Sequence, residues 1–252
     1  MEEENYTQIN SKVIDQWIEE GWEWGIPISH DDFIKVKNGE WNVLLTPTKY
    51  VPKNWFPKLS NKKLLGLASA GGQQMPIFAA LGAECTVLDY SDKQLQNEKI
   101  VSEREGYKIN IVKADMTNVL PFDNDTFDII FHPVSNIFIE NVLHVRNECY
   151  RVLTNGGLLL SGLDNGINFL FDDTEESIEI VNKLPYNPLK NKEQMKKLIE
   201  NDMGIQFSHT LEEQIGGQLK AGFKLIDLYK DYNNNGLFRE YIPTYFATKA
   251  IK

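Results

Sequence analysis

The order of hydrophobic and polar residues becomes regular near residue 60, where short apolar runs begin to alternate with helix-like segments. Five short runs rich in Val, Ile and Leu predict strands: KLLGLA, ECTVLDY, KINIVKAD, FDIIFH and LLLSGL. Three intervening segments predict helices: QMPIFAALG, the stretch after Ser91, and IENVLHVRNECYRVL, which Asn155-Gly156-Gly157 is expected to stop. Short links between strands and helices favour an α/β fold with a doubly wound parallel sheet.

Three segments depart from this alternation. Residues 1–60 contain all five tryptophans and several prolines, and they predict short helices at Asp15–Trp24 and Asp31–Lys37. This N-terminal segment is either a layer fixed to the core by aromatic side chains or a cap over a ligand pocket. Residues 164–207 are rich in Asn, Asp and Glu and predict an insertion or lid with one or two helices. At the end of the chain, KLIDLYKDY and PTYFATKAIK predict an antiparallel pair of strands, so residues 61–252 form the main domain.

Composition narrows the classes of partner. The chain has 252 residues and a net charge of −10, with 36 acidic and 26 basic side chains, which disfavours binding to a nucleic-acid backbone. Cys85 and Cys149 lie in no CxxC or His-containing ligand pattern, so neither a disulfide framework nor a structural metal is expected. The N-terminus lacks a signal-peptide pattern, and no apolar run approaches the ~20 residues of a membrane span, so we expect a cytoplasmic protein without a membrane partner.

Candidate chemistry lies at the ends of three successive predicted strands. The first strand runs into the small residues Ala68–Gly72, which allow a ligand to approach the backbone closely. Asp89 ends the second strand about 20 residues later, the spacing of an acid that accepts ribose hydroxyls, although it could instead cap the next helix. Asp115 ends the third strand, where an acid can accept an adenine amine or merely cap a turn. Because the carboxyl ends of parallel strands share one edge, these residues predict a single site.

Together these motifs resemble the class I S-adenosylmethionine-dependent methyltransferases, of the type that modifies small molecules. The resemblance runs from Lys63 to Gly162 and includes VLDYS, KADMTNVLPFDNDTFDIIF and RNECYRVLTNGGLLLSG, and the two final strands match the family's terminal hairpin. It implies a Rossmann-like doubly wound seven-stranded sheet of order 3-2-1-4-5-7-6 with an antiparallel last strand. It also implies S-adenosylmethionine as cofactor. The glycine pattern of a dinucleotide-binding turn is absent.

The first motif departs from the family pattern. Gly66, Ala68 and Ala70 replace an acid and two glycines, and only Gly72 is retained. Because alanine disfavours positive φ, the substitutions could weaken cofactor binding, but the amides of Gln73 and Gln74 are placed to meet a carboxylate. The LASxGGQQ form resembles a variant within the superfamily, so we expect cofactor binding to be retained. We expect the cofactor to contact residues from these strand ends and from the N-terminal segment: Ala68, Ser69, Ala70, Gly71, Gly72, Gln73, Gln74, Asp89, Tyr90, Ser91, Gln94, Asp115, Met116, His132, Pro133 and Trp55.

Methyl transfer needs alignment of the nucleophile and, for some acceptors, removal of a proton. His132, directly after the fourth strand, is the candidate general base, with packing or a hydrogen bond to the cofactor as the alternative. Asp164 and Asn165 are weaker candidates, and Tyr50 or Trp55 could belong to a lid. The sequence therefore predicts a small-molecule methyltransferase. Its alternatives are a non-catalytic cofactor-binding protein and a methyltransferase acting on RNA or protein. Acceptor specificity is expected to reside in residues 1–60 and 164–207.

Overall fold

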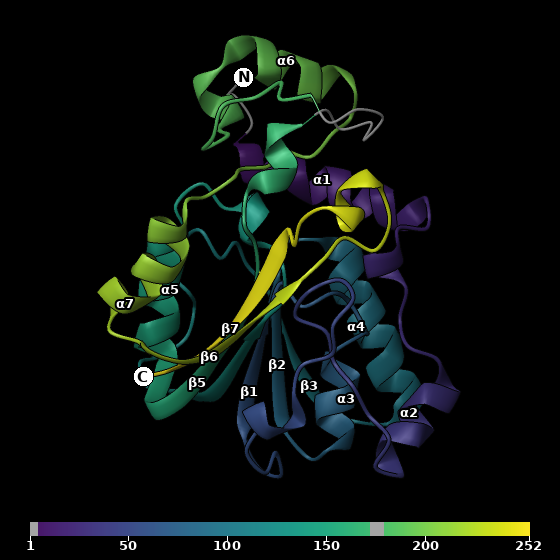
Figure 1. The fold of residues 1–252 in the computed structure, drawn as a ribbon. Coiled ribbons are helices and arrows are strands. Elements are labelled where there is room, and N and C mark those ends of the chain that lie inside the picture. Colours follow the sequence, from purple (N-terminus) through teal and green to yellow (C-terminus); the bar gives the residue numbers. More distant parts are fainter. Residues whose placement is uncertain (1–4, 172–178) are drawn as a thin grey trace.

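The computed structural model describes residues 5–171 and 179–252, and contains a seven-stranded sheet of order β3-β2-β1-β4-β5-β7-β6 (Figure 1). The first five strands are parallel, and β7 is antiparallel to both β5 and β6. This confirms the predicted doubly wound fold and its order. The strands are β1 (Lys63–Leu67), β2 (Glu84–Asp89), β3 (Ile109–Lys113), β4 (Phe127–His132), β5 (Leu153–Asp164), β6 (Lys224–Asp231) and β7 (Tyr245–Ile251).

Helices cover both faces of the sheet (Figure 1). One face carries α2 (His30–Lys37), α3 (Met75–Ala80) and α4 (Asp92–Glu105), and the other carries α5 (Val142–Val152) and α7 (Gly217–Ala221). The remaining α-helices are α1 (Tyr6–Glu19) and α6 (Lys192–Glu200), and a π-helical turn (Glu212–Gly216) precedes α7. Short 3-10 turns occupy Glu23–Gly25, Lys53–Trp55, Asn136–Phe138, Ile167–Leu170, Pro188–Lys190 and Leu237–Glu240. None of the helices in the described ranges is long and apolar enough to cross a membrane.

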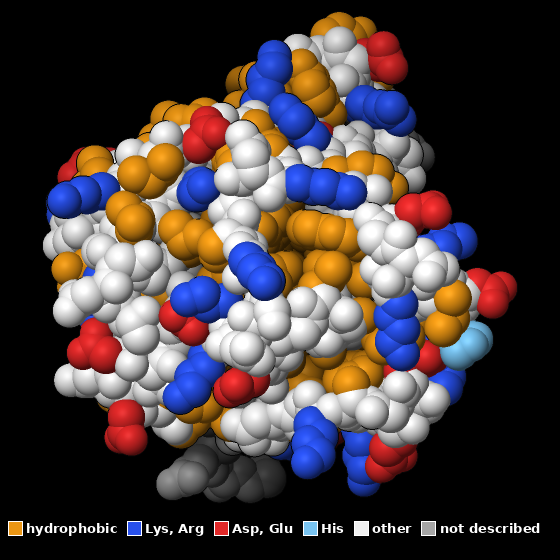
Figure 2. All heavy atoms as spheres, turned by 90° about the horizontal axis from the view of Figure 1, so that it is seen from below, with side chains coloured by type: hydrophobic (Ala, Val, Ile, Leu, Met, Phe, Trp, Pro, Cys, Tyr) orange, Lys and Arg blue, Asp and Glu red, His pale blue; other side chains and the backbone are white. Residues whose placement is uncertain are grey.

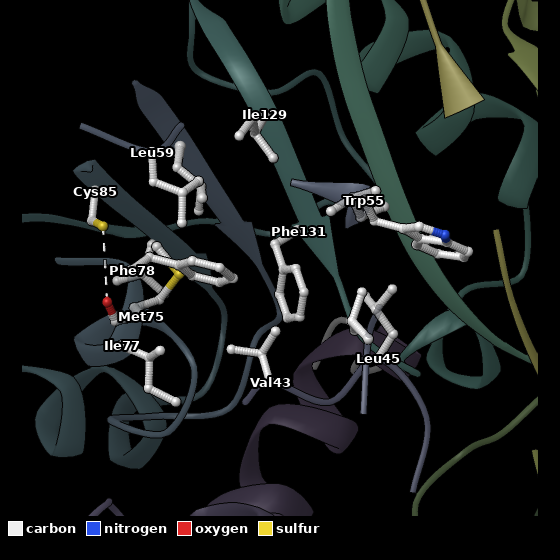
Figure 3. Close-up of a cluster of buried hydrophobic side chains, with 14 of the residues drawn as sticks. Val43, Leu45, Trp55, Leu59, Met75, Ile77, Phe78, Cys85, Ile129 and Phe131 are labelled. Atoms are coloured by element: carbon white, nitrogen blue, oxygen red, sulfur yellow. Dashed lines mark hydrogen bonds between the residues drawn. The ribbon is translucent and has the colours of Figure 1, made fainter. Parts of the chain in front are cut away.

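Two hydrophobic clusters fix the helices to the sheet. Alternate residues of a strand face opposite sides, so Leu64 of β1 packs in one cluster and Leu65 in the other. Figure 3 shows the first cluster, where the N-terminal segment contributes side chains that meet Phe78 of α3 and Phe131 of β4. Residues 43–59 are therefore a packed layer of the main core. The free thiols of Cys85 and Cys149 lie buried, one in each cluster.

Two predicted boundaries are wrong. Helix α1 begins at Tyr6 rather than Asp15, because Asn5 and Gln8 form a reciprocal capping box ahead of it. The helix α5 ends at Val152, and Asn155-Gly156-Gly157 lies inside β5 instead of stopping the helix. The pairing of β4 with β5 shifts there, with Phe127 opposite Leu153 and Ile129 opposite Leu158. The extra residues form a bulge, which the positive φ of Gly156 (79°) allows.

The N-terminal helix and the insertion meet above the carboxyl ends of the strands (Figure 1). Asn10 of α1, fully buried, donates from Nδ2 to the Ile205 carbonyl at 2.9 Å and accepts from the Ile205 N–H at 2.6 Å. Tyr6 packs edge-on against Phe207, with ring centroids 5.1 Å apart. Both contacts join α1 to the chain that follows α6. Residues 1–4 of the predicted N-terminal cap and 172–178 of the predicted insertion lie outside the described residues.

Candidate active site

A cavity of about 630 Å³ lies between the carboxyl ends of β1 to β4 and the N-terminal segment. This volume falls within the range of ligand sites in proteins. Half of the predicted cofactor residues line it: Ala68, Ala70, Gln74, Asp89, Tyr90, Gln94, Met116 and Pro133. The other half do not line it: Ser69, Gly71, Gly72, Gln73, Ser91, Asp115, His132 and Trp55.

The turn after β1 keeps a left-handed backbone at three alternate positions. Ala68, Ala70 and Gly72 have φ values of 46°, 63° and 72°, so the two alanines adopt the conformation that glycine usually supplies. Helix α4 holds the turn in place, because the Gly71 N–H donates to Gln94 Oε1 and the Gly72 N–H donates to Glu98 Oε2 at 2.8 Å. Burial raises the pKa of Glu98 to about 7. The two alanines therefore take up left-handed backbone conformations despite their Cβ atoms.

Gly66 replaces the family's acid for a packing reason. A Cβ at Gly66 would lie 2.4 Å from both Met75 Sδ and Ser69 Oγ. Met75 is fully buried, and it fills the space that an acidic side chain at Gly66 would need. The missing acid is thus coupled to the large side chain of Met75.

Asp89 is the carboxylate of the cavity wall at the end of β2. Its Oδ1 accepts the Ser91 N–H at 2.9 Å, and its side chain is 9% exposed. Burial raises the pKa of Asp89 to about 6, against the backbone hydrogen bonds that lower it, and nearby Asp15 raises it further. Helix α4 is capped by Ser91, whose Oγ accepts the Gln94 N–H, so Asp89 is not its cap.

Asp115 has the turn-capping geometry that was the alternative for this residue. Its Oδ1 accepts hydrogen bonds from the Thr117 N–H at 2.8 Å and the Thr117 hydroxyl at 2.7 Å. The residues on either side of it, Ala114 and Met116, line the cavity instead. At this strand end, the wall offered to a ligand is apolar.

His132 is completely buried and does not line the cavity. Arg146 Nη1 lies 3.1 Å from His132 Nδ1 and, because arginine only donates hydrogen bonds, Nδ1 must be the acceptor. The remaining proton of the neutral ring is therefore on Nε2, which donates to Ser135 Oγ at 2.7 Å. Burial, with the positive charge of Arg146, holds the pKa of His132 well below its ordinary value. This geometry gives His132 no free lone pair for a general base, and Ser135 forms the cavity wall in its place.

Trp55 lies in the core rather than at the cavity. Its ring packs against Tyr229 at 5.2 Å between centroids, and its Nε1 donates to Asp227 Oδ2 at 2.9 Å. Tyr50 is 59% exposed and does not line the cavity. The aromatic wall comes instead from Trp17, Trp22 and Trp24, together with Phe138 after β4. The clustering of tryptophans in the sequence indicated such a wall but did not distinguish its members from Trp55.

The two glutamines after the turn have different roles. Gln74 lines the cavity; its Oε1 accepts the Leu44 N–H at 3.1 Å, which leaves its Nε2 as a donor toward a ligand. Gln73 donates from Nε2 to the carbonyls of Glu23 and Ile26, so it fixes the N-terminal segment to the turn. Among the predicted acceptor-side residues, Asp164 is buried and binds the Gly166 N–H and the Asn168 amide, and neither it nor Asn165 lines the cavity.

Comparison with known proteins finds that the chain is similar to methyltransferases. The family model described as "Methyltransferase domain" matches residues 65–161. The Bacillus subtilis (strain 168) protein "Uncharacterized methyltransferase YbaJ" is 43% identical over 96% of this chain and 97% of its own length. Crystal structures of S-adenosylmethionine-dependent methyltransferases share the fold at 15% identity. The one from Mesorhizobium loti has a TM-score of 0.61 and the one from Listeria monocytogenes 0.60, each covering 79% of this chain and 95% of its own.

The strained turn leads to a stability prediction. A non-glycine residue in the left-handed region costs about 1–2 kcal/mol, part of which is offset by the greater freedom of glycine in the unfolded chain. We expect Ala68→Gly and Ala70→Gly each to raise the free energy of unfolding by about 1 kcal/mol. The control Ala79→Gly, inside α3, should lower it by about 0.5–1 kcal/mol. Urea unfolding monitored by circular dichroism measures all three, and equal destabilisation by them would contradict the strain.

The hydrogen bonds of His132 predict its ionisation state. Its ring should remain neutral with the proton on Nε2 from pH 5.5 to 8, because Arg146 occupies Nδ1 and burial opposes a second charge. Nitrogen–proton correlation NMR of ¹⁵N-labelled protein reports the tautomer directly, and His132→Gln identifies the signals. Protonation of the His132 ring near pH 6.5, or a proton on Nδ1 of the neutral ring, would show that this arrangement of hydrogen bonds is wrong.

Proposed function

Because the chain belongs to the class I S-adenosylmethionine-dependent methyltransferases, we propose that it methylates a small-molecule acceptor inside the cavity beneath α1. The supporting observation is the cover over the strand ends. Residues of α1, of the loop after β4 and of the chain after α6 all contribute to one wall of a cavity of about 630 Å³. Such a cover, over a cavity of this size, favours a small-molecule acceptor over a polymer.

The residues of the wall fit the cofactor. We assign Asp89 to the ribose hydroxyls, which donate hydrogen bonds to a carboxylate. Leu88, Ala114 and Met116 offer apolar contact to adenine, and Gln74 Nε2 offers a donor to the methionine carboxylate. S-adenosylmethionine supplies a methyl group that is already activated on a sulfonium. The protein's part is to align the acceptor and exclude water, and nothing in this assignment requires His132 as a base.

Other functions in the same family are less well supported. The argument for a non-catalytic cofactor-binding protein depended on the altered first motif, and the backbone of that turn keeps its left-handed conformations. An RNA acceptor is opposed by the net charge of −10 and by a described cavity wall without Lys, Arg or His. On the face opposite the cavity, basic and acidic side chains both surround hydrophobic ones (Figure 2), which is not a continuous basic surface.

Asp89 makes cofactor binding depend on pH. Ribose hydroxyls favour the carboxylate, so binding should weaken as Asp89 becomes protonated below its pKa of about 6. S-adenosylhomocysteine should bind roughly five- to tenfold more weakly at pH 5 than at pH 7.5 by calorimetry. Asp89→Asn should weaken binding at pH 7.5 and remove most of this pH dependence.

Asp92→Asn is the matched control, because Asp92 is exposed and pairs with Lys113 outside the cavity. Its affinity and pH profile should match those of the unmodified protein. Since Glu98 also ionises near neutral pH, a profile that persists in Asp89→Asn would assign the effect to Glu98 and remove Asp89 from the ribose site.

The class of acceptor can be tested by following the methyl group. Cell extract incubated with the protein and methyl-labelled S-adenosylmethionine should transfer label to its low-molecular-mass fraction, because the cavity has the size of a small-molecule site. Asp89→Asn should reduce this transfer, and Asp92→Asn should not. Protein-dependent label in RNA or in protein would overturn the proposal of a small-molecule acceptor.

A further inference from the structure

The charges on the cavity wall are of one sign. Asp89 and Glu20 supply carboxylates, and no Lys, Arg or His is present among the described residues that line the cavity. An anionic acceptor, such as a phosphate ester or a carboxylate, would therefore be desolvated with no opposite charge to meet it. The wall favours a ligand that is neutral or positively charged.

Glu20, the carboxylate on the side of the cavity formed by the N-terminal segment, has no basic partner among the described residues. Glu20 lies at the carboxyl end of α1, where the helix dipole is already negative and no basic residue occupies the last turn. Its carboxylate accepts a hydrogen bond from Gln16 and forms no ion pair with any described residue. The neighbouring Glu19 is different, because it pairs with Lys93 at 2.7 Å and does not line the cavity. Glu20 is therefore the acidic residue of this helix end that borders the cavity, where it is exposed to solvent.

Aromatic rings stand beside Glu20 on the same wall. The rings of Trp17 and Trp22 meet edge-on, with centroids 5.5 Å apart. The ring centroids of Trp17, on α1, and Phe138, in the turn after β4, are 6.5 Å apart, and all three rings line the cavity. Faces of Trp and Phe attract organic cations, and quaternary ammonium groups are bound by such clusters. This aromatic wall comes from elements other than the β1–β3 strand ends assigned to the cofactor.

Among the described residues, no histidine lines the cavity to act as a base for the acceptor, and the carboxylate on the acceptor side, Glu20, is exposed to solvent. The lone pair of His132 is occupied by Arg146, and Asp89 belongs to the strand-end side assigned to the ribose. A reaction suited to this wall is one in which the nucleophile has its own lone pair and the product keeps the positive charge. A neutral amine meets both conditions, whereas a hydroxyl must lose a proton.

We propose that the acceptor is an amine with an apolar body that loses any proton to solvent, binds as the neutral amine and is methylated at nitrogen, and that Glu20 and the aromatic wall of Trp17, Trp22 and Phe138 stabilise the ammonium product as it forms. This proposal rests on the proposed function. The nitrogen lone pair forms the new N–C bond as the C–S bond breaks, and that electron pair returns to sulfur. The positive charge passes from sulfur to nitrogen, so the net charge in the cavity does not change and no base takes part in the step.

Matched probes test the cation preference without knowledge of the natural acceptor. We would titrate the complex with S-adenosylhomocysteine with (4-hydroxyphenyl)trimethylammonium, with its neutral isostere 4-tert-butylphenol and with 4-hydroxybenzoate. The ammonium probe should bind at least tenfold more tightly than the neutral one, and the carboxylate most weakly. Glu20→Gln should reduce the preference for the ammonium several-fold, while Glu19→Gln, which removes one charge from the same helix end, should leave it unchanged.

The outcomes separate this inference from the proposed function. If S-adenosylhomocysteine does not bind, the proposed function fails first. If it binds but the ammonium and neutral probes have equal affinity, the amine acceptor is wrong while the methyltransferase assignment stands. If Glu20→Gln weakens only S-adenosylmethionine relative to S-adenosylhomocysteine, the wall serves the cofactor's own sulfonium and the inference is overturned. Equal effects of the Glu20 and Glu19 variants would also overturn it.

Discussion

The hydrogen bonds from α4 to the turn after β1 are the constraint on which the site depends. Gln94 accepts the Gly71 N–H through Oε1 and donates through Nε2 to the Trp24 carbonyl, so one buried side chain joins the turn, α4 and the N-terminal segment. Glu98 holds the next amide, that of Gly72. A Cβ at Gly71 would lie 2.1 Å from the Gln94 carbonyl oxygen, so only glycine permits this approach. Ala68 and Ala70, in the turn that these hydrogen bonds hold, adopt left-handed backbone conformations.

The second constraint is the cover over the strand ends, which is assembled from distant parts of the chain. Asn10 pairs with both backbone groups of Ile205, although 195 residues separate them. Buried backbone groups are costly when unpaired, so this contact stabilises the position of α1 and of the chain after α6 together. The same arrangement brings Trp17 toward Phe138 and places Gln206 on the cavity wall. Segments outside the sheet therefore shape this wall of the cavity.

Buried polar groups behind the wall determine which side chains remain available for chemistry. Arg146 is fully buried, contacts His132 and Ser161, and has no partner for Nε or Nη2 among the described residues. Its positive charge lies beside the imidazole and opposes protonation of that ring. The histidine consequently donates to the Ser135 hydroxyl and has no free lone pair. Carboxylates and aromatic rings line the cavity, whereas the guanidinium of Arg146 is buried and does not line it.

The sequence by itself determined the sheet and the acid at the end of β2. Strand and helix periodicities are local and predicted the α/β alternation, while the family resemblance implied the seven-stranded order; strand-end spacing predicted Asp89 at the site, and it lines the cavity. The sequence did not determine which tryptophans face the ligand, why Gly66 is tolerated, or that Ser135 replaces His132 on the wall. Each of these depends on contacts between residues far apart in the chain: Trp55 with Tyr229, Gly66 with Met75, and His132 with Arg146. Local pattern shows where a strand ends, but only tertiary packing decides which side chain there faces the cavity.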